Sequence, residues 1–512
     1  MLDLGRSFLA SVSRDPKALA LTDGATRLDY QSWFRQISAV TAALGAMGLK
    51  RGDRLASVMQ NTAEAATLHW ACQFAGIMLV PLNWRATAEE LDFVLENAEA
   101  AALAHDGAAA EAVAASPRAC ALPRLAARAA PQPGVIGFAE AAGASAPDAL
   151  PMASPEDWSL MLYTSGTTSK PKGVPRRHSA ERAAALAHVA QNLMPRGEAT
   201  LGVMPLYHTM GVRSLLSISL VNGAFHCLPR FDVATALRLI AAERISALYL
   251  VPTLYHDLLA HPDFPATDIS SVRRLGFAGA SMTDGLMARI EAAFRPDLFV
   301  NHYGSSEVYT FTIHPAAPSK PGSAGKAGLN QQIRVVRMGS GDPEAVVPAG
   351  TEGEIIATLS GDEAFEGYWR RPEADAKSLR EGWYFTGDMG FFDTEGDLFV
   401  TGRVDDMMIT GGENVAPVEV ESCLSVHEGV AECAVVGLPD ERWGQIVTAF
   451  VVPRGAVTAE ALDAHCRASA LAPFKRPRRY VLVAALPKSP VGKLLRRNLL
   501  AGDYTPLPGT TD

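Results

Sequence analysis

Residues 54–82 read RLASVMQNTAEAATLHWACQFAGIMLVPL, and they place a helical pattern between two short β-rich apolar runs. The first run is Arg54–Met59, the helical pattern is Thr62–Gly76, and the second run is Ile77–Leu82. A strand, a helix and a second strand in this order are typical of a parallel sheet that is covered by helices. Similar alternation continues to residue 302, so the sequence predicts an α/β fold for this part of the chain.

The pattern changes twice in the rest of the chain. After Ser319, short alternating runs are separated by turns, which is typical of antiparallel β structure. After Asp405, a helix that starts at Pro417 is followed by two strands and another helix, which predicts a small α+β domain. We therefore predict two domains, residues 1–404 and residues 405–512.

Composition and charge exclude several classes of protein. The 512 residues are 48% hydrophobic and 20% charged, which is typical of a folded chain with more than one domain. The net charge of -9 gives no global basic field, so we do not expect nucleic acid as a partner. The six cysteines form no CxxC pair, which argues against a disulfide scaffold or structural zinc site and fits a reducing cytosol.

No secretory signal and no run long enough to span a membrane is visible in the sequence. We therefore expect a cytoplasmic protein without a membrane partner. The sequence leaves open whether the chain forms a homodimer. The Ala-rich stretch Ala100–Ser154 is expected to form surface helices, strands and loops within the first domain, and not a linker.

The first motif with chemical meaning is YTSGTTSKPKGV at residues 163–174, which follows the apolar run Leu160–Leu162. Glycines and small hydroxyl residues let backbone N–H and side-chain O–H groups approach phosphate oxygens, and Lys172 adds positive charge. The spacing does not fit the GxxxxGK[ST] phosphate-binding loop, because Pro171, after Lys170, stands where that motif needs its second glycine. A flexible polar turn is the alternative interpretation.

With four later stretches, this motif resembles the signatures of the superfamily of acyl- and aryl-CoA synthetases, adenylation domains and firefly luciferase. The later stretches are YGSSE (303–307), YFTGD (384–388), GRVDD (402–406) running into GGEN (411–414), and PKSPVGK (487–493). Within the superfamily, GLPDERWGQIVTAFVVPR and FKRPRRY look most like the 4-chlorobenzoate– and benzoate–CoA ligases. Ser169 departs from the pattern, since most members have glycine there.

The resemblance implies a fold and a reaction. The fold would be a large N-terminal domain of helix-sandwiched sheets with a small β-barrel-like part, followed by a small mobile C-terminal α+β domain. The reaction would join a carboxylic acid to AMP at the expense of ATP, with Mg²⁺, and then transfer the acyl group to coenzyme A. Such activation is needed because a free carboxylate is a poor electrophile, and the charge that spreads over the phosphates must be neutralised.

Residue by residue, the resemblance assigns the chemistry as follows. The catalytic residues would be Lys493, His208 and Glu307, and Glu307 and Thr164 would bind the metal. The ATP-binding residues would be Thr164, Ser165, Gly166, Thr167, Thr168, Lys172, Tyr303, Asp388 and Arg403. The coenzyme A contacts would be Arg85, Gly411, Gly412, Trp443, Phe474 and Arg476, and Asp405 would be the hinge. The alternative interpretation of several of these charged residues is that they are ordinary solvated surface residues or exposed ion pairs. The motifs in which they stand favour the functional interpretation.

The same comparison outlines a pocket for the acid. Its lining would be His208, Thr209, Met210, Tyr249, Ala280, His302, Gly304, Tyr309 and Thr310. Polar groups in a buried pocket are costly unless a ligand pairs with them, so we expect a small aromatic or heteroaromatic acid that carries oxygen or nitrogen, such as a hydroxybenzoate or furoate. Alternatively, these side chains bond one another and the pocket is less selective.

Arg213, on the helix after His208, leaves a second possibility open. If its guanidinium reached the pocket, a small aliphatic or dicarboxylic acid such as malonate would be the substrate. If it points to solvent or pairs with a carboxylate, as we expect, it has no part in specificity.

Two other readings are weaker. An amino-acid adenylation module would need an acidic residue near the start of the helix after His208 to hold the α-amine, and YHTMG (207–211) offers none. A ligand-binding homologue without activity would be expected to lack Lys493, Glu307 or Lys172, and all three are present.

Overall fold

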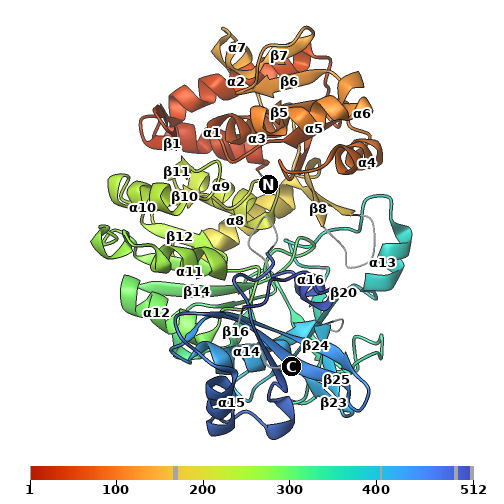
Figure 1. Cartoon of the computed structure of the whole chain (residues 1–512). Helices are drawn as coiled ribbons and strands as arrows, with labels where there is room; N and C mark the ends of the chain where they lie inside the picture. The colour runs from red at the N-terminus through yellow and green to blue at the C-terminus, as the bar shows by residue number, and fades with distance from the viewer. Residues whose placement is uncertain (1, 165–170, 404–405, 489–493, 508–512) are drawn as a thin grey trace.

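The computed structural model describes residues 2–164, 171–403, 406–488 and 494–507. Figure 1 shows the sheets stacked along the molecule, with the first sheet (orange) at one end and the C-terminal elements (blue) at the other. The middle of the molecule carries the green strands and helices of residues 199–303.

The first sheet has seven strands, which are parallel except for the hairpin of β8 and β9. In spatial order they are β7 (Val135–Gly137), β6 (Arg124–Ala127), β5 (Ala102–Asp106), β3 (Arg54–Val58), β4 (Met78–Leu82), β8 (Trp158–Thr164) and β9 (Lys172–Arg177). The central strands are buried, as expected for a sheet with helices on both faces.

The second sheet has 14 strands and two halves of different character. Its first half is parallel apart from the terminal hairpin and runs β14 (Leu298–Tyr303), β13 (Arg274–Phe277), β12 (Ala247–Leu250), β10 (Ala199–Gly202), β11 (Ala224–Cys227), β1 (Leu19–Asp23) and β2 (Thr26–Asp29). Its second half is antiparallel and runs β15 (Thr312–His314), β16 (Ser323–Ala327), β21 (Leu398–Arg403), β20 (Trp383–Phe392), β18 (Gly353–Thr358) and β17 (Ile333–Val336), with β19 (Leu379–Arg380) paired to β20.

The C-terminal part forms a sheet of its own with five strands. They are β23 (Glu413–Val415), β22 (Met408–Thr410), β25 (Gly444–Pro453) and β24 (Val430–Asp440) in order, with β26 (Arg479–Leu482) paired to β25. This sheet encloses a separate apolar core that includes Val420, Val435 and Leu462. The predicted fold class is therefore confirmed, whereas the boundary between residues 404 and 405 lies outside the described residues and stays a prediction.

Helices cover these sheets, and several begin where a side chain caps the backbone. The helices are α1 (Leu4–Arg14), α2 (Tyr30–Ala46), α3 (Ala63–Ala75), α4 (Ala88–Ala98), α5 (Ala110–Ala115), α6 (Pro117–Ala121), α7 (Phe138–Gly143), α8 (His178–Gln191), α9 (Thr209–Leu220), α10 (Val233–Ala242), α11 (Pro252–Ala260), α12 (Asp284–Phe294), α13 (Pro372–Ser378), α14 (Pro417–Ser425), α15 (Ala459–Ala468) and α16 (Arg496–Leu500). Thr62, Asp232 and Thr458 each accept a hydrogen bond from the first turn of the following helix, which fixes where α3, α10 and α15 start.

The stretch Ala100–Ser154 is part of the first sheet and not a linker, as predicted. It is less superficial than expected, because every residue of β5 is buried. No helix among the described residues combines the length and the apolar character that crossing a membrane requires.

One polar side chain is buried in the core of the first domain without a partner. His69 lies on α3, is almost fully buried, and neither ring nitrogen has a hydrogen-bond partner among the described residues. Burial lowers the pKa of His69 to about 3, and the nearby His178 acts in the same direction. The imidazole is therefore neutral in the folded chain across the physiological pH range.

This burial predicts an acid-dependent stability. Below about pH 6.5 the unfolded chain takes up a proton at residue 69 that the folded chain does not, so the free energy of unfolding falls by about 1.4 kcal/mol per pH unit for this group. His69→Leu removes the group and two unpaired buried nitrogens, and we expect equal or higher stability at pH 7 and a shallower loss between pH 6.5 and 5. Urea unfolding at both pH values measures this, and an unchanged slope would contradict it.

Candidate active site

The predicted phosphate-binding segment lies between β8 and β9. Thr164 ends β8 and pairs in register with Lys172, which begins β9. The predicted residues Ser165, Gly166, Thr167 and Thr168 come between them in sequence and lie outside the described residues. Asp405 and Lys493 also lie outside the described residues. Only the two ends of the segment are therefore described.

Three of the predicted ATP-binding residues are in direct contact. Tyr303, at the end of β14, donates a hydrogen bond of 2.6 Å from its hydroxyl to Asp388 on β20. Arg403, opposite Asp388 on β21, pairs with the same carboxylate at 3.2 Å. The Nε atom of Arg403 is buried and has no partner among the described residues, so this guanidinium retains a donor for another acceptor.

Glu307 and Lys172 form the second part of the site. Glu307 is buried in the turn after β14 and accepts a hydrogen bond of 2.8 Å from the Tyr368 hydroxyl. The Lys172 ammonium lies 4.2 Å from the centre of the Tyr368 ring. Burial lowers the pKa of Lys172, and Arg403 and two other cations lower it further while Glu307 opposes them. A cluster of cations around a carboxylate is what a polyphosphate with a bound Mg²⁺ requires.

A buried arginine that the sequence analysis did not identify supports Glu307. Arg176, on β9, donates from Nε to Glu181 on α8 at 2.9 Å. Its Nη1 donates to the backbone carbonyls of Glu307 at 3.1 Å and Glu363 at 2.6 Å. Both side chains of the Arg176–Glu181 pair are fully buried. The pair therefore connects β9, α8 and the turns that carry Glu307 and Glu363.

The nine predicted lining residues of the acid pocket divide into a rim and a base. The rim is open to solvent to different degrees and consists of His208, Thr209, Ala280 and Gly304. The base is buried and consists of Met210, Tyr249, His302, Tyr309 and Thr310. These residues come from β12, β14 and the segments that follow β10, β13 and β14, so the carboxyl ends of neighbouring parallel strands bring them together.

Arg213 contacts three residues of this base. It is 2% exposed, and it donates to the Thr310 hydroxyl at 2.7 Å, to the Tyr309 carbonyl at 3.3 Å and to the Tyr249 hydroxyl. The expectation that it points to solvent or forms an ion pair is wrong, since no carboxylate of the described residues lies within ion-pair distance. The reason is that α9 is buried on nearly all its faces, so that even its polar positions point into protein.

Two further residues behind the base were missed by the sequence analysis. Asn192, which caps the end of α8, lies between the rings of His188 and His302. The ring centres of His188, His302 and Tyr249 are 4.9 to 5.1 Å apart. Burial lowers the pKa of both histidines well below the ordinary value, and Arg213 adds to this effect, so both rings are neutral.

Arg85 lies in a cavity of about 320 Å³ between the two domains. Its other cations are Arg230 and Lys488, and its aromatic lining comes from Trp84, Tyr207 and Phe231. The Arg85 guanidinium lies 3.8 Å from the centre of the Trp84 ring. The cavity therefore offers both positive charge and flat apolar surface.

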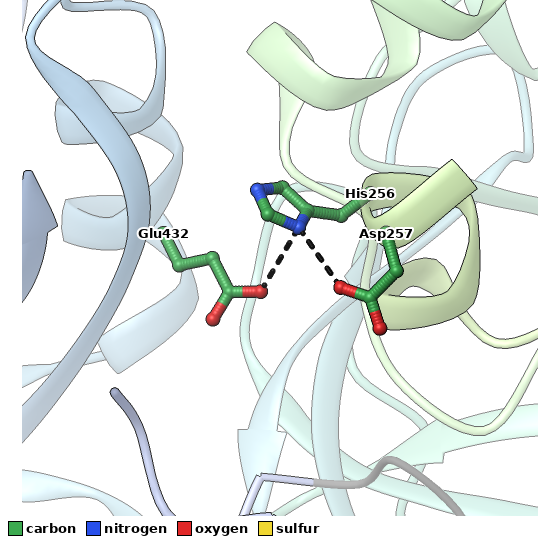
Figure 2. Close-up of side chains that lie close together, drawn as sticks. All are labelled: His256, Asp257 and Glu432. Carbon is green, nitrogen blue, oxygen red and sulfur yellow. Dashed lines mark hydrogen bonds and ion pairs between the residues drawn. The ribbon is translucent and has the colours of Figure 1, made fainter. Parts of the chain in front are cut away.

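Lys488 is tied to the domain interface beside this cavity. Its ammonium lies 2.7 Å from Oε1 of Glu432 on β24. Figure 2 shows the same carboxylate facing His256, whose Nδ1 lies 3.3 Å from Glu432 and 3.2 Å from Asp257. His256 and Asp257 belong to α11 of the large domain, so Glu432 joins the two domains through a polar contact.

The remaining predicted coenzyme A residues form a separate group on the C-terminal domain. Gly411 donates its backbone N–H to the Trp443 carbonyl at 2.9 Å, and a Cβ at Gly411 would lie 2.8 Å from the Trp443 ring. Glycine is therefore needed where this turn, with φ +61, meets the indole. Phe474 is exposed and Arg476 is half-buried. Among the described residues, no hydrogen bond or ion pair joins this group to Arg85.

Comparison with known proteins decides the family. The AMP-binding enzyme family matches residues 8–369, and the AMP-binding enzyme C-terminal domain matches residues 419–493. The chain belongs to the AMP-binding enzyme family. It is an adenylate-forming acid–CoA ligase that uses ATP, Mg²⁺ and coenzyme A, as the resemblance implied.

Individual relatives in this family act on aromatic acids, by their names. The chain is 34% identical to a 4-chlorobenzoate–CoA ligase of Arthrobacter sp., over 96% of this chain and 93% of that protein. It is 34% identical to a feruloyl-CoA synthase of Amycolatopsis sp., over 94% and 95% of the two chains. The structure of the anthranilate CoA ligase AuaEII in complex with anthranoyl-AMP matches with a TM-score of 0.89 and 26% identity, over 98% and 97% of the two chains.

The Arg176–Glu181 pair generates a prediction about stability. Glu181→Leu leaves a buried guanidinium without its counter-charge, and we expect a loss of about 3–5 kcal/mol in the free energy of unfolding. Arg176→Met with Glu181→Leu removes both charges and should recover part of that loss. The exposed pair Arg118–Glu96, at 3.0 Å, is the control and should be worth less than about 1 kcal/mol. Urea unfolding of Glu181→Leu, of the double variant and of the corresponding single and double variants Glu96→Leu and Arg118→Met with Glu96→Leu measures this, and equal losses at both pairs would contradict it.

Proposed function

We propose that this ligase activates a small aromatic or heteroaromatic carboxylic acid that carries oxygen or nitrogen, such as a hydroxybenzoate or furoate. In the first half-reaction, a carboxylate oxygen attacks the α-phosphorus of ATP, and diphosphate leaves. In the second, the thiol of coenzyme A attacks the acyl carbon, and AMP leaves. The acyl-CoA that results is a reactive thioester of the ring acid.

The observation that carries this proposal is the chemistry of the buried base. Tyr249, His302 and Thr310 bring hydroxyl and imidazole groups to positions that are at most 6% exposed. Arg213 already donates to the Tyr249 and Thr310 hydroxyls, but Nδ1 of His302 has no partner among the described residues. Because a buried polar atom without a partner is costly, a ligand that forms a hydrogen bond with it is bound in preference to a purely apolar one. The flat rings of Tyr249 and His302 favour an aromatic ligand over a flexible aliphatic one.

The proposed roles of the other residues follow their chemistry. Asp388 would accept the ribose hydroxyls, and Lys172 and Arg403 would neutralise the phosphates beside Glu307, which would hold Mg²⁺ with Thr164. The bound Mg²⁺ would draw negative charge away from the phosphates as diphosphate leaves. His208 would stack beside the carboxylate at the rim of the pocket.

We propose that Lys493 bridges the carboxylate and the α-phosphate during adenylation. It belongs to the C-terminal domain of residues 405–512, and rotation about Asp405 would withdraw it for the second half-reaction. Coenzyme A would then bind through Arg85 and the group of Gly411, Gly412, Trp443, Phe474 and Arg476. The cavity around Arg85 supports this, because its cations and aromatic rings suit a nucleotide with phosphates.

A small dicarboxylic acid remains the second candidate, because Arg213 is buried beside the base. A second carboxylate would pair with a free guanidinium. However, Arg213 already donates to Tyr249, Tyr309 and Thr310. Its charge also lies near the buried Glu363, whose pKa burial raises and Arg213 lowers. A ligand carboxylate is therefore not needed to balance this charge.

The experiment that tests the proposal is diphosphate release from ATP with a panel of acids, first without and then with coenzyme A. The panel contains benzoate, hydroxybenzoates, furoate, acetate and malonate. We expect release with the substituted ring acids and thioester only after coenzyme A is added. Preference for malonate would favour the second candidate, and release with none of the acids would refute the substrate class.

Lys172 predicts how the reaction depends on pH. The ammonium is charged below its pKa, and burial lowers that pKa, so the positive charge is lost at a lower pH than for an ordinary lysine. We expect kcat/KM for ATP, which reports the free enzyme, to fall on the alkaline side at a lower pH than an ordinary lysine would cause.

Lys172→Arg keeps the charge to higher pH and should move that fall upward, by a unit or more. Lys326→Arg, on an exposed position of β16, is the matched control and should leave the profile unchanged. Rates of diphosphate release across pH 7–10.5 measure this. An alkaline limb at the same pH in both variants would show that another group causes it.

A further inference from the structure

A backbone carbonyl fixes the orientation of the Asn192 amide. The Asn192 side-chain nitrogen lies 2.8 Å from the carbonyl oxygen of His188, and a carbonyl can only accept. The nitrogen must therefore face His188, and the amide oxygen must face away from it. The positions of the Asn192 side-chain oxygen and nitrogen are therefore assigned from the protein alone, without reference to any ligand.

The amide in turn fixes the protonation of both histidine rings. Its oxygen lies 3.0 Å from Nε2 of His302, so Nε2 must carry the proton and donate. Its nitrogen lies 3.1 Å from Nδ1 of His188, so Nδ1 must accept. Because both rings are neutral, the Nδ1 atom of His302 carries a lone pair and no proton.

That lone pair has no partner in the part of the chain that the structure describes. His302 is 2% exposed, and its Nδ1 is buried without a hydrogen bond. A cavity of about 20 Å³ beside Asn192 and Tyr249 is large enough for about one water, but His302 does not line it. Water in that cavity therefore does not supply the partner.

The ring of Tyr249 lies beside the ring of His302 and carries a hydroxyl. Its hydroxyl oxygen accepts a hydrogen bond from Arg213, so its own O–H is free to donate. The ring centres of Tyr249 and His302 are 5.0 Å apart. Two neighbouring rings among the buried residues of the predicted acid pocket thus carry one donor and one acceptor.

We propose that Asn192 is a positioning residue that holds His302 as an acceptor, and that His302 selects acids with a hydrogen-bond donor on the ring. The inference rests on the proposed function and narrows it. A ring hydroxyl fits best, because it can donate to His302 and accept from Tyr249. An amino group or a pyrrole N–H can donate to His302 but does not accept from Tyr249. Furoate and fluorobenzoate carry no ring donor, so they leave Nδ1 of His302 without a partner.

The test compares matched acids that differ in the donor. Hydroxybenzoates and aminobenzoates are compared with the fluorobenzoates of the same substitution, and pyrrole-2-carboxylate with furoate, by kcat/KM for diphosphate release at pH 8. For the wild type we expect the best donor acid to exceed its partner by about 10- to 100-fold. Activity without any preference for donors would overturn the inference but not the ligase, whereas no release with any acid would overturn the proposed substrate class.

Two substitutions separate positioning from packing. Asn192→Asp keeps an oxygen that accepts from His302 Nε2, and Asn192→Leu removes it, while both lose the bonds to His188. We expect the donor preference to persist in Asn192→Asp and to fall to within about threefold in Asn192→Leu, as the freed imidazole can place its proton on either nitrogen. Ser217→Ala, in the wall of the same small cavity, controls for local packing and should keep the preference.

Equal preference in the aspartate and leucine variants would overturn the role of Asn192. If neither variant folds, the wild-type comparison of donor and fluoro acids still decides whether His302 Nδ1 acts as an acceptor.

Discussion

The guanidinium of Arg176 is the buried charge on which the arrangement of the site depends. Its N–H groups require acceptors and a counter-charge, because an unpaired cation in the interior is prohibitively costly. The carboxylate of Glu181 supplies the counter-charge, and it and the carbonyls of Glu307 and Glu363 accept from Nε and Nη1, while Nη2 has no partner among the described residues. Three segments far apart in sequence must therefore converge on one group. The turn that presents Glu307 to Lys172 and Tyr368 is placed by a residue outside every predicted binding set.

A second layer of buried polar groups lies behind the predicted acid pocket. Arg213 and Glu363 add one cation and one anion to Arg176 and Glu181, so the charges of the two arginines and two glutamates balance. With that balance met inside the protein, no charged ligand group is needed to offset a buried charge. The pocket would then distinguish between acids through hydrogen bonds to neutral groups. Such bonds discriminate strongly between acids, since a wrong substituent leaves a buried atom without a partner.

The sequence predicted those parts of the fold and the site whose signals are local. Thr62, where the predicted helical pattern begins, could be recognised as a helix start because a capping side chain acts within three residues. Arg176 could not be recognised, since the neighbouring Arg177 has the same side chain but faces the opposite side of β9 and is partly exposed.

Asn192 and His302 are 110 residues apart, and only the end of α8 against β14 brings them together. Motifs identify residues that meet a shared ligand, but long-range packing decides which buried groups lie behind them. The same limit applies to Arg213, because the wholly buried character of α9 follows from the elements that surround it and not from its own amphipathic pattern.

The contacts of Glu432 bear on the proposed rotation of the C-terminal domain, because one of them crosses the domain interface and the other lies within the C-terminal domain. One carboxylate oxygen, Oε1, faces both His256 of the large domain and Lys488 of its own domain. The rotation that we propose would break the first contact and leave the second intact, because Glu432 and Lys488 move together. The loss would be small, since all three side chains are partly exposed and water can replace the broken contact. Lys488 would thus keep its contact with Glu432 on β24 in both orientations, while its contribution to the lining of the cavity around Arg85 would change.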